Sequence, residues 1–157
     1  MKYFLFLILF VSSLITTQAQ VFSPGQEESQ VVDPVSWDAK LEKQNDSIYK
    51  LVVKASIEKT WHLYSQHLGD EGPIPTTFSF EEAPEQYLLR GEMEEPDVPS
   101  IFDEVFEMEI KFFEDEAVFT QMIKVLDENA VIKFEVEFMA CNDTQCLPPE
   151  TVPFQIS

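Results

Sequence analysis

The chain has 157 residues, of which 45% are hydrophobic and 13% aromatic, and its formal net charge is −19 at pH 7. This composition excludes a disordered polymer and fits a domain with a single hydrophobic core. The acidic charge excludes nucleic acid as a partner and opposes binding to an anionic membrane surface. Acidic residues are densest over residues 81–116, where the only cations are Arg90 and Lys111, a pattern typical of a solvated acidic face.

The amino terminus has the pattern of an export signal. Lys2 is followed by an apolar run over residues 3–15 and then by small and polar residues that end at Ala19. A transmembrane helix needs about 20 apolar residues, so this run is too short to span a bilayer. We therefore expect a signal peptide over residues 1–19 and a mature protein that does not insert into the membrane. Residues 20–33 predict a flexible leader, and the folded domain is expected over residues 34–157.

Alternation of apolar and polar residues predicts strands along the whole domain. The pattern is clearest over residues 49–58, 106–112 and 132–138. Shorter strands are expected at residues 35–41, 76–80, 86–89, 118–126 and 152–156. No segment has a convincing pattern of an amphipathic helix. Seven or eight short strands of this kind predict an all-β fold, an immunoglobulin-like antiparallel β-sandwich.

Cys141 and Cys146 are the two cysteines of the chain, and four polar turn-forming residues separate them. In an exported domain such a pair is either a structural disulfide or a redox-active dithiol. A structural crosslink over so short a loop contributes only about 2 kcal/mol in the chain-entropy model. By the alternation of the preceding strand, Cys141 falls on the outward phase with Glu137 and Met139. We therefore expect its thiol to be exposed and able to meet a partner.

The sequence around the two cysteines is acidic. No Lys or Arg occurs in residues 134–157, whereas Asp143 and Glu150 flank the pair. An anionic environment disfavours the thiolate, so both thiols are expected to react slowly with small oxidants and quickly only inside a docked complex.

Three sequence segments carry a resemblance to a known family. Residues 141–150 are Cys-Asn-Asp-Thr-Gln-Cys-Leu-Pro-Pro-Glu, and upstream are residues 61–66, Trp-His-Leu-Tyr-Ser-Gln, and residues 72–76, Gly-Pro-Ile-Pro-Thr. Together they resemble the N-terminal periplasmic domain of the thiol:disulfide interchange protein DsbD family, over residues 34–157. The resemblance implies a periplasmic immunoglobulin-like module and a thiol:disulfide interchange enzyme that needs no cofactor. It also implies that Cys146 forms the mixed disulfides with partners and that Cys141 resolves them.

Members of this family are reduced by a thioredoxin-like domain that draws on a membrane-embedded redox domain, and they then reduce disulfide isomerases or cytochrome-maturation proteins. Neither of those two further domains occurs in the 157 residues. The resemblance therefore implies that thioredoxin-like redox proteins, or a separate membrane-embedded reductase, act as partners of this chain.

The resemblance further implies a cap over the cysteine pair. The corresponding residues here are Phe102, Asp103, Glu104, Val105 and Phe106. Because Val105 stands where the family has an aromatic residue, the shielding ring is expected from Phe102 or Phe106. Phe106 alternatively belongs to the core face of its own predicted strand. Tyr64 is a second expected neighbour of the cysteines by family position.

Two other functions compete with thiol exchange. In the first, the chain is a non-catalytic immunoglobulin-like binding module with a structural Cys141–Cys146 disulfide, and its acidic face docks a basic partner. In the second, His62 and His67 join the cysteines as metal ligands. Their spacing matches no standard site, so no metal is expected, and His62 is interpreted as a surface residue.

Overall fold

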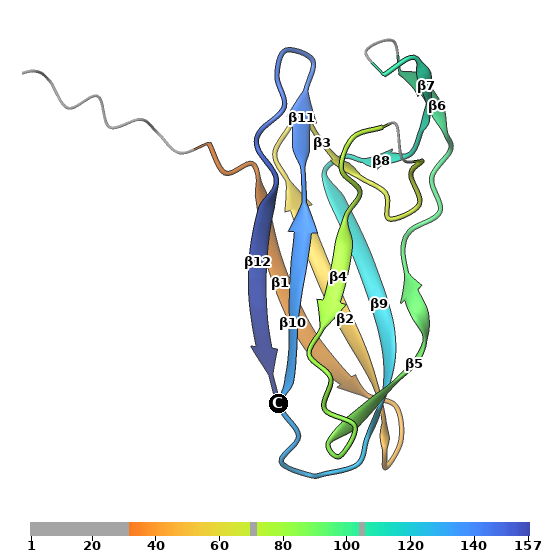
Figure 1. Ribbon diagram of the computed structural model, residues 1–157, viewed down its shortest axis with the longest axis vertical. Helices are drawn as coiled ribbons and strands as arrows, with labels where there is room; N and C mark the ends of the chain where they lie inside the picture. The colour runs from red at the N-terminus through yellow and green to blue at the C-terminus, as the bar shows by residue number, and fades with distance from the viewer. Residues whose placement is uncertain (1–31, 70–71, 104–105) are drawn as a thin grey trace, which may run out of the picture. The chain divides into compact units, whose positions relative to one another are not determined.

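The computed structural model describes residues 32–69, 72–103 and 106–157 (Figure 1). Every regular element in this part of the chain is a β-strand, and the paired strands run antiparallel. The all-β fold predicted from the sequence is therefore confirmed. The predicted signal peptide and the leader up to residue 31 lie outside the described residues. Among the described residues there is no helix with the length and apolar character that a membrane span requires.

One sheet contains four strands in the order β1-β2-β9-β5 (Figure 1). These are β1 (Val35–Lys43), β2 (Ile48–Ile57), β9 (Glu116–Val125) and β5 (Tyr87–Glu94). Period-two alternation explains the central pair, because Leu51, Val53 and Ala55 on β2 lie directly opposite Gln121, Phe119 and Ala117 on β9. All six side chains are buried, so this face of the sheet is the core face.

Strand β5 extends to Glu94, beyond residue 89, where the sequence predicted its end. A bulge interrupts its pairing with β9 between Arg90 and Glu94. Gly91 adopts a φ of 74° there, a conformation that costs an L-residue with a Cβ about 1 kcal/mol or more. The bulge leaves two carbonyls that accept hydrogen bonds from the buried Gln121 side chain, at 3.1 Å for Arg90 and 3.4 Å for Gly91. The buried side-chain amide of Gln121 thus finds hydrogen-bond acceptors in the irregular backbone of β5.

The opposing sheet has the order β12-β10-β4, formed by β12 (Glu150–Ile156), β10 (Ile132–Phe138) and β4 (Thr77–Phe80). On β10 the apolar positions are buried and Lys133, Glu135 and Glu137 are exposed, as the alternation predicts. The buried Phe134 stacks between Phe80 at 5.3 Å and Phe154 at 4.9 Å, which are its register partners on the two neighbouring strands.

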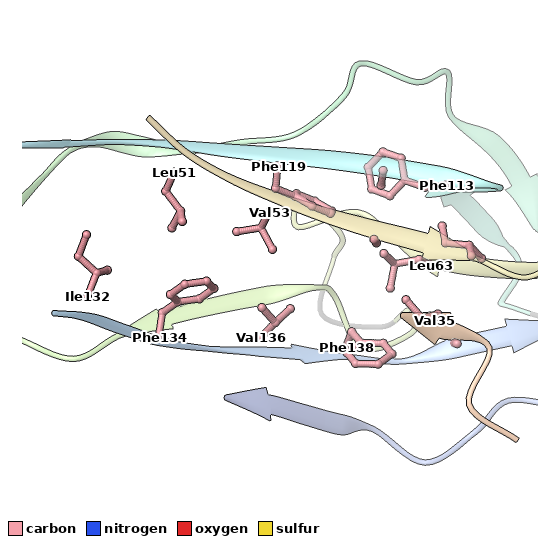
Figure 2. Close-up of a cluster of buried hydrophobic side chains, with 14 of the residues drawn as sticks. Val35, Leu51, Val53, Leu63, Phe113, Phe119, Ile132, Phe134, Val136 and Phe138 are labelled. Atoms are coloured by element: carbon pink, nitrogen blue, oxygen red, sulfur yellow. The ribbon is translucent and has the colours of Figure 1, made fainter. Parts of the chain in front are cut away.

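The core lies between these two sheets. Figure 2 shows Leu51, Val53 and Phe119 facing Ile132, Phe134 and Val136 of β10. Phe119 is fully buried, and its ring contacts those of Trp37, Phe78 and Phe113 at centroid distances of 6.0, 5.0 and 5.6 Å. Burying an aromatic side chain of this size stabilises a fold by about 1.5–3 kcal/mol, so these contacts hold the two sheets together.

Short strands lie at one end of the sandwich, uppermost in Figure 1. One small sheet has the order β11-β3-β8, with β11 (Ala140–Asn142), β3 (Trp61–Tyr64) and β8 (Phe112–Phe113). A hairpin of β6 (Ile101–Asp103) and β7 (Met108–Ile110) lies at the same end. Strand β6 was not expected from the sequence.

The single strand predicted over residues 106–112 is wrong. Phe106 lies in the turn before β7, and β7 and β8 are separate strands that pair with different neighbours. The two strands also bury side chains on different sides, since Ile110 contacts residues near Cys141 whereas Phe113 enters the main core. Lys111 lies between the two strands, and its carbonyl accepts a hydrogen bond of 3.1 Å from the Ser65 amide.

Candidate functional site

Cys141 and Cys146 form a disulfide at the tip of the hairpin that follows β10. The strand continues from β10 into β11, and the chain then turns back so that Cys146 pairs with Cys141 across an antiparallel bridge, with 4.0 Å between their Cα atoms. The amide of Leu147 donates to the carbonyl of Ala140 at 2.9 Å and closes the hairpin below the disulfide.

Asn142 organises the turn between the two sulfurs. Its side-chain Oδ1 accepts hydrogen bonds from the Thr144 amide at 2.9 Å, the Thr144 hydroxyl at 2.8 Å and the Gln145 amide at 2.9 Å. Its own amide donates to the Gln145 carbonyl at 2.8 Å. An asparagine that bonds the backbone ahead of it is a common turn device, and here it holds the disulfide in a tightly bonded loop.

The two sulfurs differ strongly in access. Cys146 is exposed, whereas Cys141 is only 4% exposed. The prediction that the Cys141 thiol is exposed is therefore wrong. Its alternation was assigned correctly, because Ala140 enters the main core and Cys141 points to the other face, but that face is itself covered.

We name the group of residues that covers Cys141 the end cluster. Tyr64, Ile110 and Cys141 are its buried members, and the partly buried side chains packed against them are Leu68, Phe106, Met108, Phe112 and Met139. These residues come from several segments that are distant in the sequence. The outward face of β11 is therefore an interior surface rather than a solvent-exposed one.

Strand β3 supplies two side chains on the cysteine side. Trp61 and Leu63 enter the main core, so His62 and Tyr64 point to the opposite face. Tyr64 is 3% exposed. Burial raises the pKa of Tyr64 to about 12, and the nearby Asp103 carboxylate adds to the rise.

The described members of the predicted cap lie beside the disulfide. Phe102, Asp103 and Phe106 line one groove together with both cysteines and Tyr64. Phe106 meets the ring of Tyr64 edge to face at 6.5 Å, and its amide donates to Asp103 Oδ1 at 3.0 Å. Phe106 thus packs in the end cluster and not in the sandwich core, the alternative raised for it from the sequence.

The other aromatic side chain of the predicted cap, that of Phe102, is exposed to solvent. Phe102 is 57% exposed at the rim of the groove. Glu104 and Val105, the other two predicted cap residues, lie outside the described residues.

His62, which was considered from the sequence only as a metal ligand or a surface residue, lies at the site. It is the direct register partner of Cys141 between β3 and β11, and it lines the same groove. Its ring stacks on Phe112 at 4.3 Å and its Nε2 lies 3.2 Å from Glu114 Oε1, so its side chain is only 22% exposed. The expectation of a surface histidine is wrong. The available signal was its alternation with Tyr64, which places both residues on the cysteine side of one strand.

The groove is acidic, as expected from the local sequence. Asp103 and Asp143 line it, and neither Lys nor Arg is among its described lining residues. His67, the second candidate metal ligand, lines a different groove with Glu92 and Lys111. Within the described residues no group of three or more His, Cys, Asp or Glu side chains is arranged to hold a metal ion.

Fold and site together define a class of protein: a β-sandwich domain with an accessible disulfide in a short hairpin, one sulfur exposed and the other buried. The family model described as thiol:disulfide interchange protein DsbD, N-terminal, matches residues 27–157, and the chain belongs to this family. No curated protein matches the sequence.

Solved structures agree on the fold. The reduced N-terminal domain of Neisseria meningitidis DsbD matches with a TM-score of 0.53 at 19% identity, covering 77% of this chain and 84% of that one. A complex of the DsbD and PilB N-terminal domains from the same organism matches with a TM-score of 0.51 at 14% identity, covering 87% and 88%. The N-terminal periplasmic domain of ScsB from Proteus mirabilis gives 0.58 at 12% identity, covering 80% of this chain and 47% of that one. The predicted immunoglobulin-like sandwich is thereby confirmed.

Proposed function

We propose that the chain is a periplasmic thiol:disulfide interchange enzyme that passes reducing equivalents to disulfides of partner proteins. Its family membership supports thiol exchange as the chemistry. The observation that carries the division of roles is the difference in access between the two sulfurs, with Cys146 exposed and Cys141 buried. Cys146 is then the sulfur that bonds to partners, and Cys141 is the one that resolves the mixed disulfide.

The exchange proceeds in two balanced steps. The Cys146 thiolate attacks a partner disulfide, a Cys146–partner bond forms, and the partner's second sulfur leaves as a thiolate. The Cys141 thiolate then attacks Cys146 Sγ, the intramolecular disulfide forms, and the partner's first sulfur leaves. The partner gains two electrons and the domain loses two, so no cofactor is required. The hairpin makes the second step effectively unimolecular, because it holds the two Cα atoms 4.0 Å apart.

We propose that the segment 102–106 shields the disulfide until a partner docks. Phe106 packs in the end cluster and its amide donates to Asp103, whereas Phe102 is exposed at the rim. In this proposal Phe102 and Phe106 supply the apolar cover, Tyr64 packs beneath it, and Glu104 and Val105 complete the segment. A partner that displaces Phe102 would reach Cys146 first, because Cys141 lies deeper.

The partners that we propose are thioredoxin-like redox proteins, with a thioredoxin-like protein or a separate membrane-embedded reductase as the electron donor. The solved complex of the Neisseria meningitidis DsbD and PilB N-terminal domains supports a protein as the docking partner. We also propose that residues 1–19 are a signal peptide, that residues 20–33 are a leader, and that the mature protein acts in the periplasm. Mass spectrometry of the exported protein from a periplasmic extract tests this, because its first residue should be Gln20.

Trapping experiments on the two single-cysteine variants test the division of roles. A thioredoxin with one active-site cysteine, activated as a mixed disulfide with an aromatic thiol, serves as the probe. Cys141→Ala should form a stable covalent complex through Cys146, whereas Cys146→Ala should react at least about tenfold more slowly because its remaining thiol is buried. Equal rates, or the reverse order, would contradict the proposal.

The reduction potential separates exchange from a purely structural disulfide. Structural disulfides of secreted proteins lie below about −300 mV, and exchanging ones lie higher. Equilibration of the full chain with a thioredoxin couple should therefore give a value above that limit. A value well below it, together with no trapped complex, would favour a non-catalytic binding module.

A further inference from the structure

His62 occupies a position that bears directly on the chemistry of Cys141. Residues directly opposite in an antiparallel pair have Cβ atoms about 4.5–5.5 Å apart and point to the same face. His62 and Cys141 are such a pair, and both line the groove at the disulfide. The register therefore places the imidazole of His62 and the sulfur of Cys141 on neighbouring strands at the same groove.

The resolving step needs a proton acceptor at this place. Cys141 attacks as a thiolate, yet its side chain is almost fully buried, and burial disfavours the charged form of a thiol. The carboxylates of the groove make this worse, because Asp103 of β6 and Asp143 of the hairpin are acidic, whereas Tyr64 of β3 is a neutral phenol. Among the described lining residues, His62 is the only histidine, and imidazole is the side chain that most often serves as a general base.

The contacts of His62 hold its ring in one orientation. Stacking on Phe112 fixes the plane of the ring, and Nε2 lies 3.2 Å from Glu114 Oε1. A carboxylate only accepts hydrogen bonds, so Nε2 carries the hydrogen and Nδ1 keeps the free lone pair of a neutral imidazole. Glu114 also stabilises the imidazolium that forms when Nδ1 takes up a proton. Glu114 and Phe112 thus orient an imidazole whose register partner is the buried cysteine.

We propose that His62 is the general base that deprotonates Cys141 during resolution of the mixed disulfide. This inference rests on the exchange function proposed above. Neutral His62 takes the proton of the Cys141 thiol, and the thiolate attacks Cys146 Sγ. The Cys141–Cys146 bond forms, the Cys146–partner bond breaks, and its electron pair leaves on the partner sulfur. The proton on His62 then passes to that sulfur or to solvent, and in the reverse reaction His62 protonates the Cys141 thiolate as it leaves.

A coloured aromatic disulfide, dithiobis(nitrobenzoate), separates the two steps in the full reduced chain. The first equivalent of nitrothiobenzoate is released when Cys146 attacks the reagent, and the second when Cys141 resolves the adduct. In His62→Phe, which retains a ring to stack on Phe112, the second phase should slow by about 30-fold or more at pH 7. About 30-fold is the shortfall of thiolate in an unassisted thiol with the ordinary pKa of about 8.5. Burial of Cys141 adds to that shortfall. The first phase should be unchanged.

The pH dependence of the second phase gives a readout that a structural role would not change. Without the base, the rate of the second phase should rise about tenfold per pH unit between about pH 6 and pH 8. The reason is that the thiolate fraction of Cys141 rises about tenfold per pH unit below the pKa of the thiol. With His62 present, the slope over this range should be much smaller. His62→Gln, which keeps a polar side chain but accepts no proton, should behave as His62→Phe does. The matched control is His67→Phe, whose exposed histidine lines another groove and should leave both phases unchanged.

Equal second-phase rates and equal pH slopes in the wild type and both His62 variants would overturn the assignment of His62 and leave the exchange function standing. A wild-type chain that releases no second equivalent would overturn the exchange function and this assignment with it. The two failures are therefore distinguishable in one experiment.

Discussion

Tyr64 illustrates how the end cluster changes the chemistry of a single residue. Its phenol is buried on the cysteine side of β3, next to the edge of the Phe106 ring and near Asp103. Both burial and a neighbouring carboxylate disfavour the phenolate, and burial is the larger of the two effects. Burial in the end cluster, with the Asp103 carboxylate adding to it, therefore raises the pKa of Tyr64 to about 12.

This shift predicts an alkaline loss of stability. The pKa of Tyr64 is higher in the folded chain, about 12, than the ordinary value of 10.0, so the folded state holds a proton that the unfolded state has lost. The contribution is fully present below about pH 10 and is lost as the pH rises towards about 12. Relative to Tyr64→Phe, the wild type should lose about 1 kcal/mol of unfolding free energy between pH 9 and pH 11, measured by urea titration. If the difference in unfolding free energy between the wild type and Tyr64→Phe stays constant from pH 9 to pH 11, the buried position of Tyr64 is contradicted.

At the scale of elements, the hairpin after β11 is held by one side chain as well as by the disulfide that it carries. Asn142 accepts three hydrogen bonds within the turn, and the chain reverses direction through them. None of these bonds involves a cysteine, so reduction of the disulfide does not itself break them. They are thus positioned to keep Cys141 and Cys146 adjacent in the dithiol state, where the resolving step requires it.

Asn142→Ala is therefore expected to loosen the hairpin. Losing the shared acceptor of three local bonds should lower the unfolding free energy by about 1–2 kcal/mol, with a larger effect in the reduced protein than in the oxidised one. Urea titration of both redox forms measures this. Asp143→Ala, at the exposed position next to it, is the matched control and should change the unfolding free energy by less than about 0.5 kcal/mol. An equal effect of the two substitutions would argue against a special role of Asn142.

At the scale of the whole molecule, charge selects what approaches the disulfide. The chain has 29 acidic residues against 10 basic ones, and the groove at the cysteines is lined by aspartates. A negative field of this kind attracts cationic groups and repels anionic ones, and salt screens both effects. Partner surfaces around the reacting disulfide are therefore expected to be basic or neutral.

Two small disulfides of opposite charge test this without any partner protein. The reduced chain should be oxidised by cystamine, a dication, about tenfold faster than by glutathione disulfide, a net anion, at low ionic strength. The ratio should fall towards the ratio shown by a neutral-peptide dithiol at about 1 M salt, where the screening length is about 3 Å. A ratio that does not depend on salt would mean that the field of the protein plays no part.

The local pattern of the sequence determined much of this protein. Period-two alternation predicted β1, β2, β9, β10 and β12, since a strand that has one buried face repeats every two residues whatever surrounds it. The short spacing and polar turn residues also placed Cys141 and Cys146 together on one hairpin, because a turn is specified by its own few residues.

Tertiary structure decided what covers each face. Alternation correctly predicted that Cys141 and Ala140 point to opposite faces. Only the packing of Tyr64, Phe106 and Ile110, from segments distant in the sequence, made the face of Cys141 an interior one. The same packing split the predicted strand at Lys111 and set His62 opposite Cys141. Register and burial depend on contacts between segments far apart in the sequence, and a period-two pattern records which face a residue points to but not what lies beyond it.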